Sequence, residues 1–417
     1  MKTLKGSLFL FIAIFTSSSF ANNWYDRGNA GFALFCDSKA PELLDVHEIS
    51  ARHFRTADFP KVHGTLEKVI ELISRLDEID PARSALYKEW AREFFFSVQF
   101  ASSMEFAPTP DLGLVKVPFG CSLQQVAFQR TPSILNSVRY IINLNHWTQL
   151  DENNQAALVL HEIIYREFVT TNTAETSSER IRYFNSMLIA NAFKGMTLPQ
   201  YLEILRELHF SHYRYASLEL LIGYIDDRGE WNSTYMNFAD DGSIETATLS
   251  RLQKIDRHYL QYSCGVKKDG ELAIVKLSPN GLLRSLQVVP SFNSNDGCPL
   301  PHAEYIQGDD SFKIYGDTMI FNEEGVPTEI SSSRKLGYFE SFSYKGNVFN
   351  FRMSQGPATS YYRFDDGFNL VELGLGGAPC LNPRTHHVDF LPANSYNEAN
   401  VYLKADGSFE TQPPLCY

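Results

Sequence analysis

The sequence predicts an α+β domain with a buried central helix and a small sheet (residues 22–227), followed by an all-β antiparallel domain of repeated hairpins (residues 228–417). Two observations lead to this prediction. The stretch 155–169 is apolar on nearly every side, which is typical of a helix buried inside a domain. After about residue 228, short alternating segments are separated by tight turns that recur roughly every 40 residues.

Residues 1–21 have the pattern of a secretory signal peptide. Lys2 and Lys5 precede an apolar run at residues 8–15, and Ser19-Phe20-Ala21 ends in residues suited to signal peptidase. We therefore expect cleavage after Ala21 and a secreted or periplasmic protein. No later segment approaches the ~18 apolar residues of a membrane helix, so no membrane span is expected.

The charge of the mature chain argues against two classes of partner. Without Lys2 and Lys5, 35 basic residues face 49 acidic ones, a formal charge of −14. Such an acidic chain is a poor match for nucleic acid or anionic lipid. The mature length of 396 residues (417 − 21) favours two domains over one.

An even number of cysteines in an exported chain indicates disulfides. Two lie in the first half and four in the second, so the simplest expectation is a Cys36–Cys121 bond, with the other four paired among themselves. A structural zinc site is a weaker alternative, because no Cys-x-x-Cys occurs. The candidates are Cys36, Cys121, Cys264, Cys298, Cys380 and Cys416.

The remaining elements of the first domain follow from periodicity and from Pro and Gly punctuation. Pro41 suits the first position of a helix that ends near Phe54. The pattern predicts further helices at 64–76, 81–96, 178–193 and 198–208, and strands at 114–117, 123–128 and 137–143. Asp151 is the expected N-cap of the central helix.

The central helix carries His161, Glu162, Tyr165 and Arg166. In His-Glu-x-x-His zinc sites, two histidines four residues apart bind one ion and the glutamate polarises a water. Tyr165 stands where the second histidine would be, so His161 is the one metal ligand that this motif retains. Glu167, Glu175 and Glu179 follow as candidates for a third ligand.

A structural role for the same residues is the favoured interpretation. Glu162 and Arg166 are four residues apart in the favourable order and can pair along the helix. His161 and Tyr165 lie on the next strip of the helix and can stack and hydrogen-bond inward. Such a buried quartet would determine how the helix sits against its neighbours.

Several segments resemble a group of exported proteins of Gram-negative bacteria that carry a Leu-His-Glu-x-x-Tyr-Arg helix. The similar segments are 28–31 with Cys36, 120–127, Trp147, 157–167 and 182–185. The helix also has a weak similarity to zincin metallopeptidases. Relatives in the first group often have Gly-His and Asn-Ser between the two helices, whereas residues 171–178 here contain no histidine. The resemblance implies a shared architecture over residues 28–200 and no particular activity.

The repeated phrase of the second half is an aromatic or aliphatic residue followed, three or four positions later, by glycine. The glycines are separated by 39, 44, 42 and 40 residues. Asp-Gly and Asn-Gly supply the positive φ that tight hairpins need. A barrel, packed sheets or a small propeller would each accommodate this period. The glycines are Gly242, Gly281, Gly325, Gly367 and Gly407.

These observations favour an exported two-domain interaction protein, whose repeat domain binds a protein or glycan of the envelope or the exterior. A metal-dependent, peptidase-like hydrolase using His161 and Glu162 is the alternative, and an inactive relative of such an enzyme is a third interpretation. No cofactor is expected for the favoured function, and zinc is the candidate for the alternative.

Overall fold

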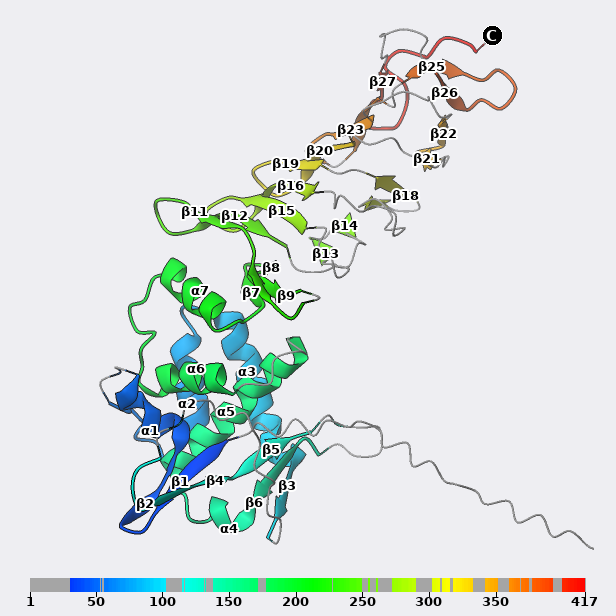
Figure 1. Ribbon diagram of the computed structural model, residues 1–417. Helices are drawn as coiled ribbons and strands as arrows, with labels where there is room; N and C mark the ends of the chain where they lie inside the picture. The colour runs from blue at the N-terminus through cyan, green and yellow to red at the C-terminus, as the bar shows by residue number, and fades with distance from the viewer. Residues whose placement is uncertain are drawn as a thin grey trace, which may run out of the picture.

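The molecule consists of a helical part and a long stack of β-strands that extends from it (Figure 1). This confirms the predicted fold class, an α+β region followed by an all-β region. Residues 1–30, which include the predicted signal peptide, lie outside the part that the computed structural model describes. The described residues are 31–52, 54, 56–102, 115, 117–130, 132, 138–171, 178–226, 228–249, 254–255, 260–261, 272–289, 302–307, 310–315, 318–332, 342–351, 360–367, 369–374, 377–392 and 400–416.

Helix α5 (Glu152–Thr171) is the centre of the helical part, and α2, α3 and α6 pack around it (Figure 1). From 156 to 165 every residue is at most 1% exposed, as the uninterrupted apolar pattern predicted. The predicted N-cap is confirmed, because Asp151 Oδ1 accepts from the Asn154 N–H at 2.8 Å. The surrounding helices are α1 (Leu44–Ala51), α2 (Thr65–Ile73), α3 (Pro81–Phe94), α4 (Leu144–Trp147), α6 (Glu179–Ile189) and α7 (Leu198–Glu207).

Two small sheets cover one end of this helical layer. One has the order β2-β1-β4, with β1 (Phe32–Cys36), β2 (Lys39–Leu43) and β4 (Cys121–Gln125). The other has the order β3-β6-β5, with β3 (Val98–Ala101), β5 (Ala127–Gln129) and β6 (Tyr140–Asn143). Cys36 and Cys121 face each other across β1 and β4 and form the predicted disulfide, with an S–S distance of 2.06 Å.

Two sequence predictions are wrong in this region. Pro41 does not open a helix but lies in β2, an edge strand whose free side tolerates a residue without an N–H, and α1 begins at Leu44. Of the predicted strand 114–117 only residues 115 and 117 are described, and neither lies in a strand.

Four short strands join the helical part to the stack. β7 (His212–Tyr215) pairs with β8 (Leu218–Leu221), and β9 (Gly223–Ile225) pairs with β10 (Trp231–Ser233). Leu220 of β8 bridges to Leu249, at the end of the second strand of the stack. No described helix has the length and hydropathy needed to cross a membrane.

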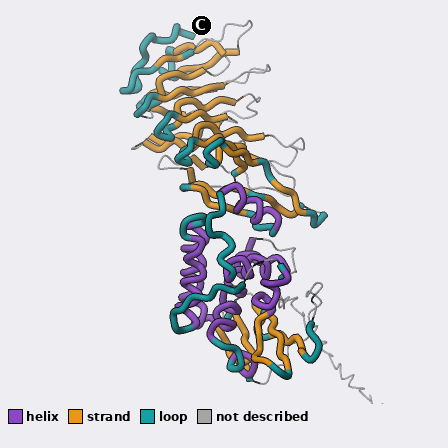
Figure 2. Tube along the Cα trace, turned by 90° about the vertical axis from the view of Figure 1, so that its left-hand side faces the viewer, coloured by secondary structure: helices purple, strands orange, loops and turns teal. Residues whose placement is uncertain are grey.

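A nine-stranded antiparallel sheet forms the body of the stack (Figures 1 and 2). Its order, β11-β12-β15-β16-β19-β20-β23-β24-β27, follows the chain from one hairpin to the next. The sheet ends at β11 and β27 and is therefore neither a closed barrel nor a propeller of separate blades. Its strands are β11 (Met236–Phe238), β12 (Ile244–Thr248), β15 (Leu272–Leu277), β16 (Leu283–Val289), β19 (Thr318–Phe321), β20 (Pro327–Ser332), β23 (Ser360–Phe364), β24 (Leu370–Gly374) and β27 (Val401–Tyr402).

The repeated phrase of the sequence is the turn of each hairpin in this sheet. The first residue of the phrase pairs with the residue six positions later, as in Phe238 with Ile244 and Leu277 with Leu283. The glycine four positions after the first residue has φ between 79° and 85° in four of the turns. Gly367 comes only three positions after Phe364, and residue 368 lies outside the described residues. The same turn joins β9 to β10, with Gly229 at φ 79°, which the sequence reading missed.

One row of apolar residues crosses the whole sheet on its inner face. Each member faces the next across neighbouring strands, and each described member after the first is at most 5% exposed. A continuous buried row explains why the array needs its hairpins in strict register, because a slip by one residue would turn every side chain to the other face. The row is Met236, Ala247, Val275, Leu286, Met319, Ile330, Tyr362, Leu373 and Val401.

A second set of hairpins alternates with the first along the chain. β14 lies beside β17, and β18 lies beside β21 and β20, which makes the array one of packed sheets. Cys380 of β25 is bonded to Cys416, consistent with pairing among the last four cysteines, whereas Cys264 and Cys298 lie outside the described residues. The strands are β13 (Lys254–Ile255), β14 (Leu260–Gln261), β17 (His302–Gln307), β18 (Asp310–Tyr315), β21 (Phe342–Tyr344), β22 (Asn347–Phe351), β25 (Gly377–Leu381) and β26 (Val388–Pro392).

The turn at Gly281 should tolerate a side chain less well than the turn at Gly325. Its φ is 79°, and an added Cβ would lie 2.8 Å from the Ala216 Cβ, a group that the backbone holds in place. Gly325 has a similar φ of 81°, but its nearest contact would be Leu282 at 3.8 Å. We expect Gly325→Ala to cost about 1–2 kcal/mol from the left-handed backbone alone. Gly281→Ala should cost about 1–3 kcal/mol more, from overpacking. Urea unfolding of both variants tests this, and equal losses would contradict it.

Candidate functional site: a buried cluster on the central helix

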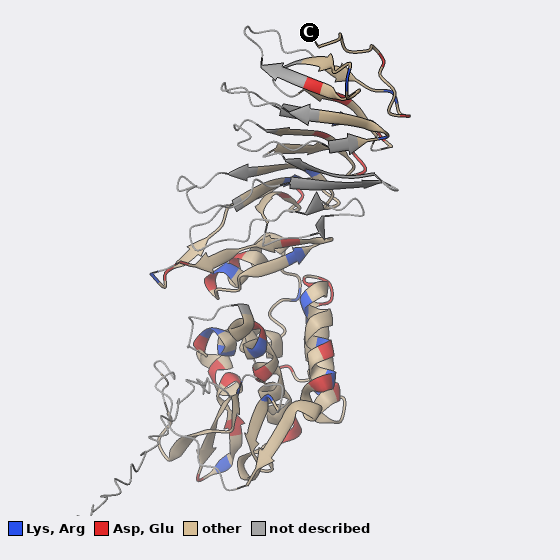
Figure 3. Ribbon diagram, turned by 90° about the vertical axis from the view of Figure 1, so that its right-hand side faces the viewer, with Lys and Arg blue, Asp and Glu red and all other residues tan. Residues whose placement is uncertain are grey.

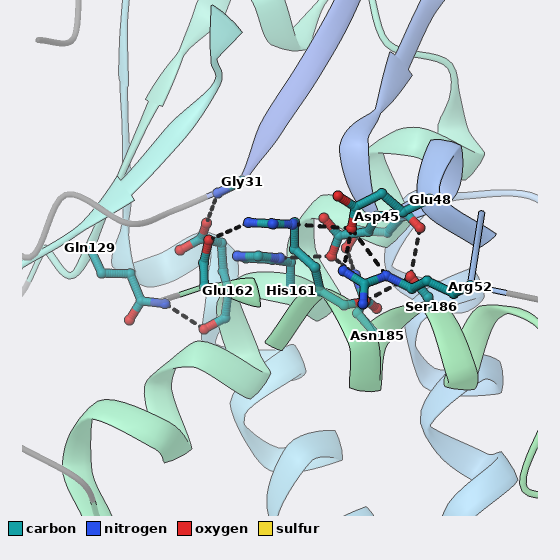
Figure 4. A network of polar contacts seen from close by, with 12 residues as sticks. Gly31, Asp45, Glu48, Arg52, Gln129, His161, Glu162, Asn185 and Ser186 are labelled. Carbon is teal, nitrogen blue, oxygen red and sulfur yellow. Dashed lines mark hydrogen bonds and ion pairs between the residues drawn. The ribbon is translucent and has the colours of Figure 1, made fainter. Parts of the chain in front are cut away.

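The predicted site residues His161 and Glu162 lie in the middle of α5 and meet residues from two other helices (Figure 4). Asp45 comes from α1, and Asn185 and Ser186 come from α6. We call these five residues the His161 cluster. His161 is 1% exposed, and Asp45 and Glu162 are fully buried. The sequence did not identify Asp45, because nothing near it marks it as a partner of a residue 116 positions away.

His161 and Asp45 form a buried hydrogen-bonded ion pair. The His161 Nδ1 lies 2.7 Å from the Asp45 Oδ2, which also accepts from the Asn185 Nδ2 at 2.6 Å. The Ser186 hydroxyl donates to the Asp45 carbonyl at 2.7 Å. These contacts join α1, α5 and α6 through polar groups in an otherwise apolar core, so their geometry determines how the three helices dock.

Glu162 holds the first described segment of the chain. Its Oε1 accepts from the Gly31 N–H at 2.9 Å (Figure 4). The Gln129 side chain donates to the Glu162 carbonyl. An added Cβ at Gly31 would overlap the buried Leu158 side chain, so a larger residue would have to displace that side chain. Glu162 therefore links the central helix to the start of β1 and to β5.

Burial and the charges of neighbouring residues oppose each other in this cluster. Burial alone would raise the pKa of Asp45, but His161 and Asn185 together bring that pKa below its ordinary value. Burial alone would lower the pKa of His161, but Asp45 raises it above its ordinary value. For Glu162 burial dominates and raises the pKa, although His161 and the Gly31 N–H oppose this. The charged His161–Asp45 pair is thus the favoured state near neutral pH.

These directions predict a stability maximum on the acid side of neutrality. A raised pKa of His161 contributes stability that is complete below its unfolded value of about 6.5 and is lost as pH rises through the folded pKa. The raised pKa of Glu162 acts in the same direction above pH 4.5. The lowered pKa of Asp45 contributes stability above pH 3.8 that is lost as pH falls through the folded pKa.

We therefore expect the free energy of unfolding to fall as the pH rises above 6.5, and to fall again at strongly acidic pH. Urea unfolding across this range measures it, and the NMR titration of the His161 ring tests the cause directly. A His161 midpoint below 6.5 would contradict the assignment.

Tyr165 and Arg166 take different roles from each other. The Tyr165 ring stacks on the His161 ring with centroids 6.5 Å apart and planes at 21°, as predicted. The expected Glu162–Arg166 pair does not form, because Glu162 binds the Gly31 N–H. Arg166 instead lies over the Trp90 ring at 4.2 Å and reaches Glu93 at 3.8 Å. The four residues therefore contact different parts of the protein and do not form one quartet.

The metal alternative depends on the donor groups near His161. His161 uses its Nδ1 for Asp45, and the position one turn further is Tyr165. Among the described residues no group of three His, Cys, Asp or Glu side chains is arranged to hold a metal ion. Of the proposed third ligands, Glu167 binds Arg83 and Tyr87, and Glu175 lies outside the described residues.

A second buried network, which the sequence reading missed, lies at the other end of α5. Arg83 of α3 is ion-paired with Asp80 and with Glu167 of α5, the latter at 3.1 Å. Its guanidinium also donates to the Tyr201 hydroxyl at 3.0 Å and to the His212 carbonyl at 2.9 Å. The available signal was Asp80 at the N-cap with Arg83 three residues later. This network ties α3, α5, α7 and β7 together where the helical part meets the strands.

The outer face of the nine-stranded sheet is partly exposed. A second row crosses all nine strands on this face, and the exposed fractions of Ile320, Arg363 and Tyr402 are 42%, 53% and 44%. Arg363 lies between Glu329 at 3.3 Å and Glu372 at 2.8 Å. Charged residues are frequent on the helices and sparse on the coloured strands (Figure 3). The row is Asn237, Thr246, Lys276, Ser285, Ile320, Glu329, Arg363, Glu372 and Tyr402.

Comparisons of the chain with models of known protein families, with curated proteins and with solved structures found no match.

Proposed function

We propose that this chain is an exported bacterial binding protein whose nine-stranded sheet presents its outer face to a protein or glycan of the envelope or the exterior. The observation that supports this proposal is the difference in solvent exposure between the outer row of the sheet and the two site residues on α5. The outer row has exposed aliphatic, aromatic, charged and amide side chains at five of its nine positions, although Thr246 and Glu372 are only 8% exposed. His161 and Glu162, in contrast, are at most 1% exposed. A substrate cannot reach groups that are covered on all sides, but a partner can lie across an open face.

The chemistry of the outer face fits a partner of mixed character. Ile320 and Tyr402 supply apolar and aromatic surface, and the Glu329–Arg363–Glu372 group supplies a localised charge pattern. Exposed aromatic residues flanked by polar groups suit both protein surfaces and sugar faces. Export agrees with two disulfides and with the absence of a membrane-crossing helix from the described residues.

Site-specific photocrosslinking tests the proposal. A photoreactive residue is placed at Ile320 or at Tyr402 in the mature chain, and at Glu89, an exposed position on α3, as the control. In envelope extracts of the source cells, we expect discrete adducts from positions 320 and 402 and none from 89. Charge reversal by Arg363→Glu should reduce the yield, because it removes both ion pairs of the row. Equal yields at all three positions, or no adducts, would refute the face as the binding surface.

A metal-dependent hydrolase, or an inactive relative of one, is a second candidate that one observation favours. Within the described part of the chain, the His161 Nε2 and the Glu162 Oε2 are buried and have no hydrogen-bond partner. Buried polar atoms of this kind need a water, an ion or a proton to offset their burial. Metal analysis of the mature protein and of His161→Ala decides this candidate. Stoichiometric zinc that His161→Ala abolishes would favour the hydrolase.

A further inference from the structure

The nine-stranded sheet ends at β27, and residues 408–410 lie along the edge of that strand. On its inner side β27 pairs with β24. On its outer side the Glu410 N–H donates to the Tyr402 carbonyl at 3.0 Å, and Leu403 forms an antiparallel bridge with Phe409. Backbone groups that an end strand would present to other chains are therefore bonded within this chain.

The same segment continues to the end strand of the second sheet. This strand is β25, in the order β21-β22-β26-β25. The Leu381 N–H of β25 donates to the Pro414 carbonyl at 2.7 Å, and the Cys416 N–H donates to the Leu381 carbonyl at 3.0 Å. The Cys380–Cys416 disulfide fixes this contact. Both end strands lie near the C-terminal end of the stack (Figure 1). We call residues 408–416, which bind to both strands, the edge segment.

The edge segment begins as a further hairpin of the repeat and then departs from it. Leu403 pairs with Phe409 six positions later, as in the earlier turns, and Gly407 has φ 85°. The return strands β12, β16, β20 and β24 have between five and seven residues. Here the bridge at Phe409 is soon followed by Pro413 and Pro414, which have no N–H to donate to another strand. The segment therefore ends the ladder where earlier hairpins extend it.

The edge segment also covers the end of the buried apolar row. Val401 and Leu403 of the row's end are 2% and 1% exposed. Phe409 packs against this core, and its ring lies 6.4 Å from the Phe349 ring with planes at 70°. Without the segment, β27 would expose apolar side chains together with free backbone N–H and C=O groups. Such an edge is a template for pairing with another chain.

We infer that the edge segment is a disulfide-fixed cap that prevents β27 from pairing with β27 of a second copy of this chain. Two identical edges pair about a twofold axis, which gives a closed dimer. In an antiparallel pair centred on Tyr402, Val401 of one copy faces Leu403 of the other, so the apolar row continues across the dimer. The Tyr402 carbonyl, which now accepts from Glu410, then accepts from the second copy. This inference concerns the sheet edge and does not depend on the proposed binding role of the outer face.

Sedimentation velocity of a shortened chain tests the cap. The variant spans residues 22–407 and carries Cys380→Ser, so that Cys380 is not left as a free thiol. We expect the wild-type protein from residue 22 to sediment as a monomer, and the shortened chain to dimerise at least tenfold more tightly. A synthetic peptide of residues 408–416 with Cys416→Ser should bind the freed edge and return the shortened chain to the monomer.

A substitution on β27 tests whether the dimer uses this edge. The Tyr402 carbonyl faces the edge segment, so the N–H of the same residue faces the same side of the strand. Tyr402→Pro in the shortened chain removes that donor and should abolish the dimer, because proline on an edge strand blocks pairing. Dimers that persist with Tyr402→Pro, or with the peptide in excess, would use another surface and would overturn the inference. Open-ended oligomers in place of dimers would overturn the twofold pairing.

The full-length chain tests the disulfide separately. Cys380→Ser with Cys416→Ser keeps the whole edge segment but removes its covalent attachment, and we expect dimerisation stronger than in the wild type and weaker than in the shortened chain. Cys36→Ser with Cys121→Ser is the matched control, because it removes the disulfide between β1 and β4 and leaves the cap intact. It should remain a monomer.

Two outcomes would refute the cap. One is a shortened chain that stays monomeric while its circular dichroism spectrum shows the strand content of the wild type. The other applies if the shortened chain does not fold, in which case the full-length variant without the Cys380–Cys416 disulfide decides. A folded full-length variant that is as monomeric as the wild type, or that dimerises no more than the Cys36–Cys121 control, would then overturn the inference.

Discussion

Asp45→Ala is expected to lower the free energy of unfolding by about 3–5 kcal/mol, the cost of leaving one member of a buried ion pair without its partner. Asp45 is fully buried and accepts from both His161 and Asn185. Without its carboxylate, His161 must either keep a buried charge with no counterion or release its proton. The pH dependence of stability above pH 6.5 should therefore become shallower in this variant, because the raised pKa of His161 depends on Asp45.

Urea unfolding of wild type and variant measures this loss. Asp45→Asn preserves the shape of the side chain and removes the charge. Its loss of unfolding free energy should therefore be smaller than that of Asp45→Ala. Asp406→Ala is the control, because Asp406 is an exposed acceptor in the last hairpin turn, and we expect little change there. A loss of under about 1 kcal/mol in Asp45→Ala would show that the His161 cluster does not hold the helices together.

Arg83→Met is expected to have an effect of similar size, again about 3–5 kcal/mol, by leaving buried carboxylates unpaired. Arg83 serves two of them at once, Asp80 and Glu167, and also donates to the His212 carbonyl. Burial raises the pKa of Asp80, and Arg83 opposes that rise. Since Arg83 joins three helices to β7, its loss should also weaken the attachment of the strands to the helical part.

Urea unfolding combined with limited proteolysis near residue 212 measures both effects. Arg83→Lys should recover only part of the stability, because one ammonium group cannot bond all the partners of the guanidinium fork. Arg206→Met is the control, since Arg206 pairs only with the exposed Glu203 of its own helix, and we expect about 0.5 kcal/mol. Equal losses in Arg83→Met and Arg206→Met would contradict the structural role of this network.

The repeat and the central helix could be predicted because their signals are local. Phe238 and Gly242 lie within one turn, and the positive φ at Gly242 is a property of that turn. The apolar stretch of α5 is likewise a property of consecutive residues, and so is the Asp151 cap. The mistake at Pro41 has the opposite origin, because pairing with β1 overrode a local helix preference.

The partners of the buried ionisable groups could not be predicted, because they come from distant parts of the chain. Glu162 binds the N–H of a residue 131 positions away, and Arg83 binds a carboxylate 84 positions away. The helical spacing of Glu162 and Arg166 suggested a local pair, but burial of Glu162 against β1 offered a backbone donor instead.

The sequence by itself determined that this protein has a buried helix with ionisable residues, a disulfide across its first half and a hairpin array with a period near 40. Helical periodicity and turn chemistry depend on residues that are close together in the sequence. The distribution of the cysteines can be counted from the sequence directly. Only the tertiary structure decided that His161 and Glu162 are covered on all sides and that the hairpins share one open sheet. Burial and pairing depend on which distant segments pack together, and this follows from the free energy of the whole fold.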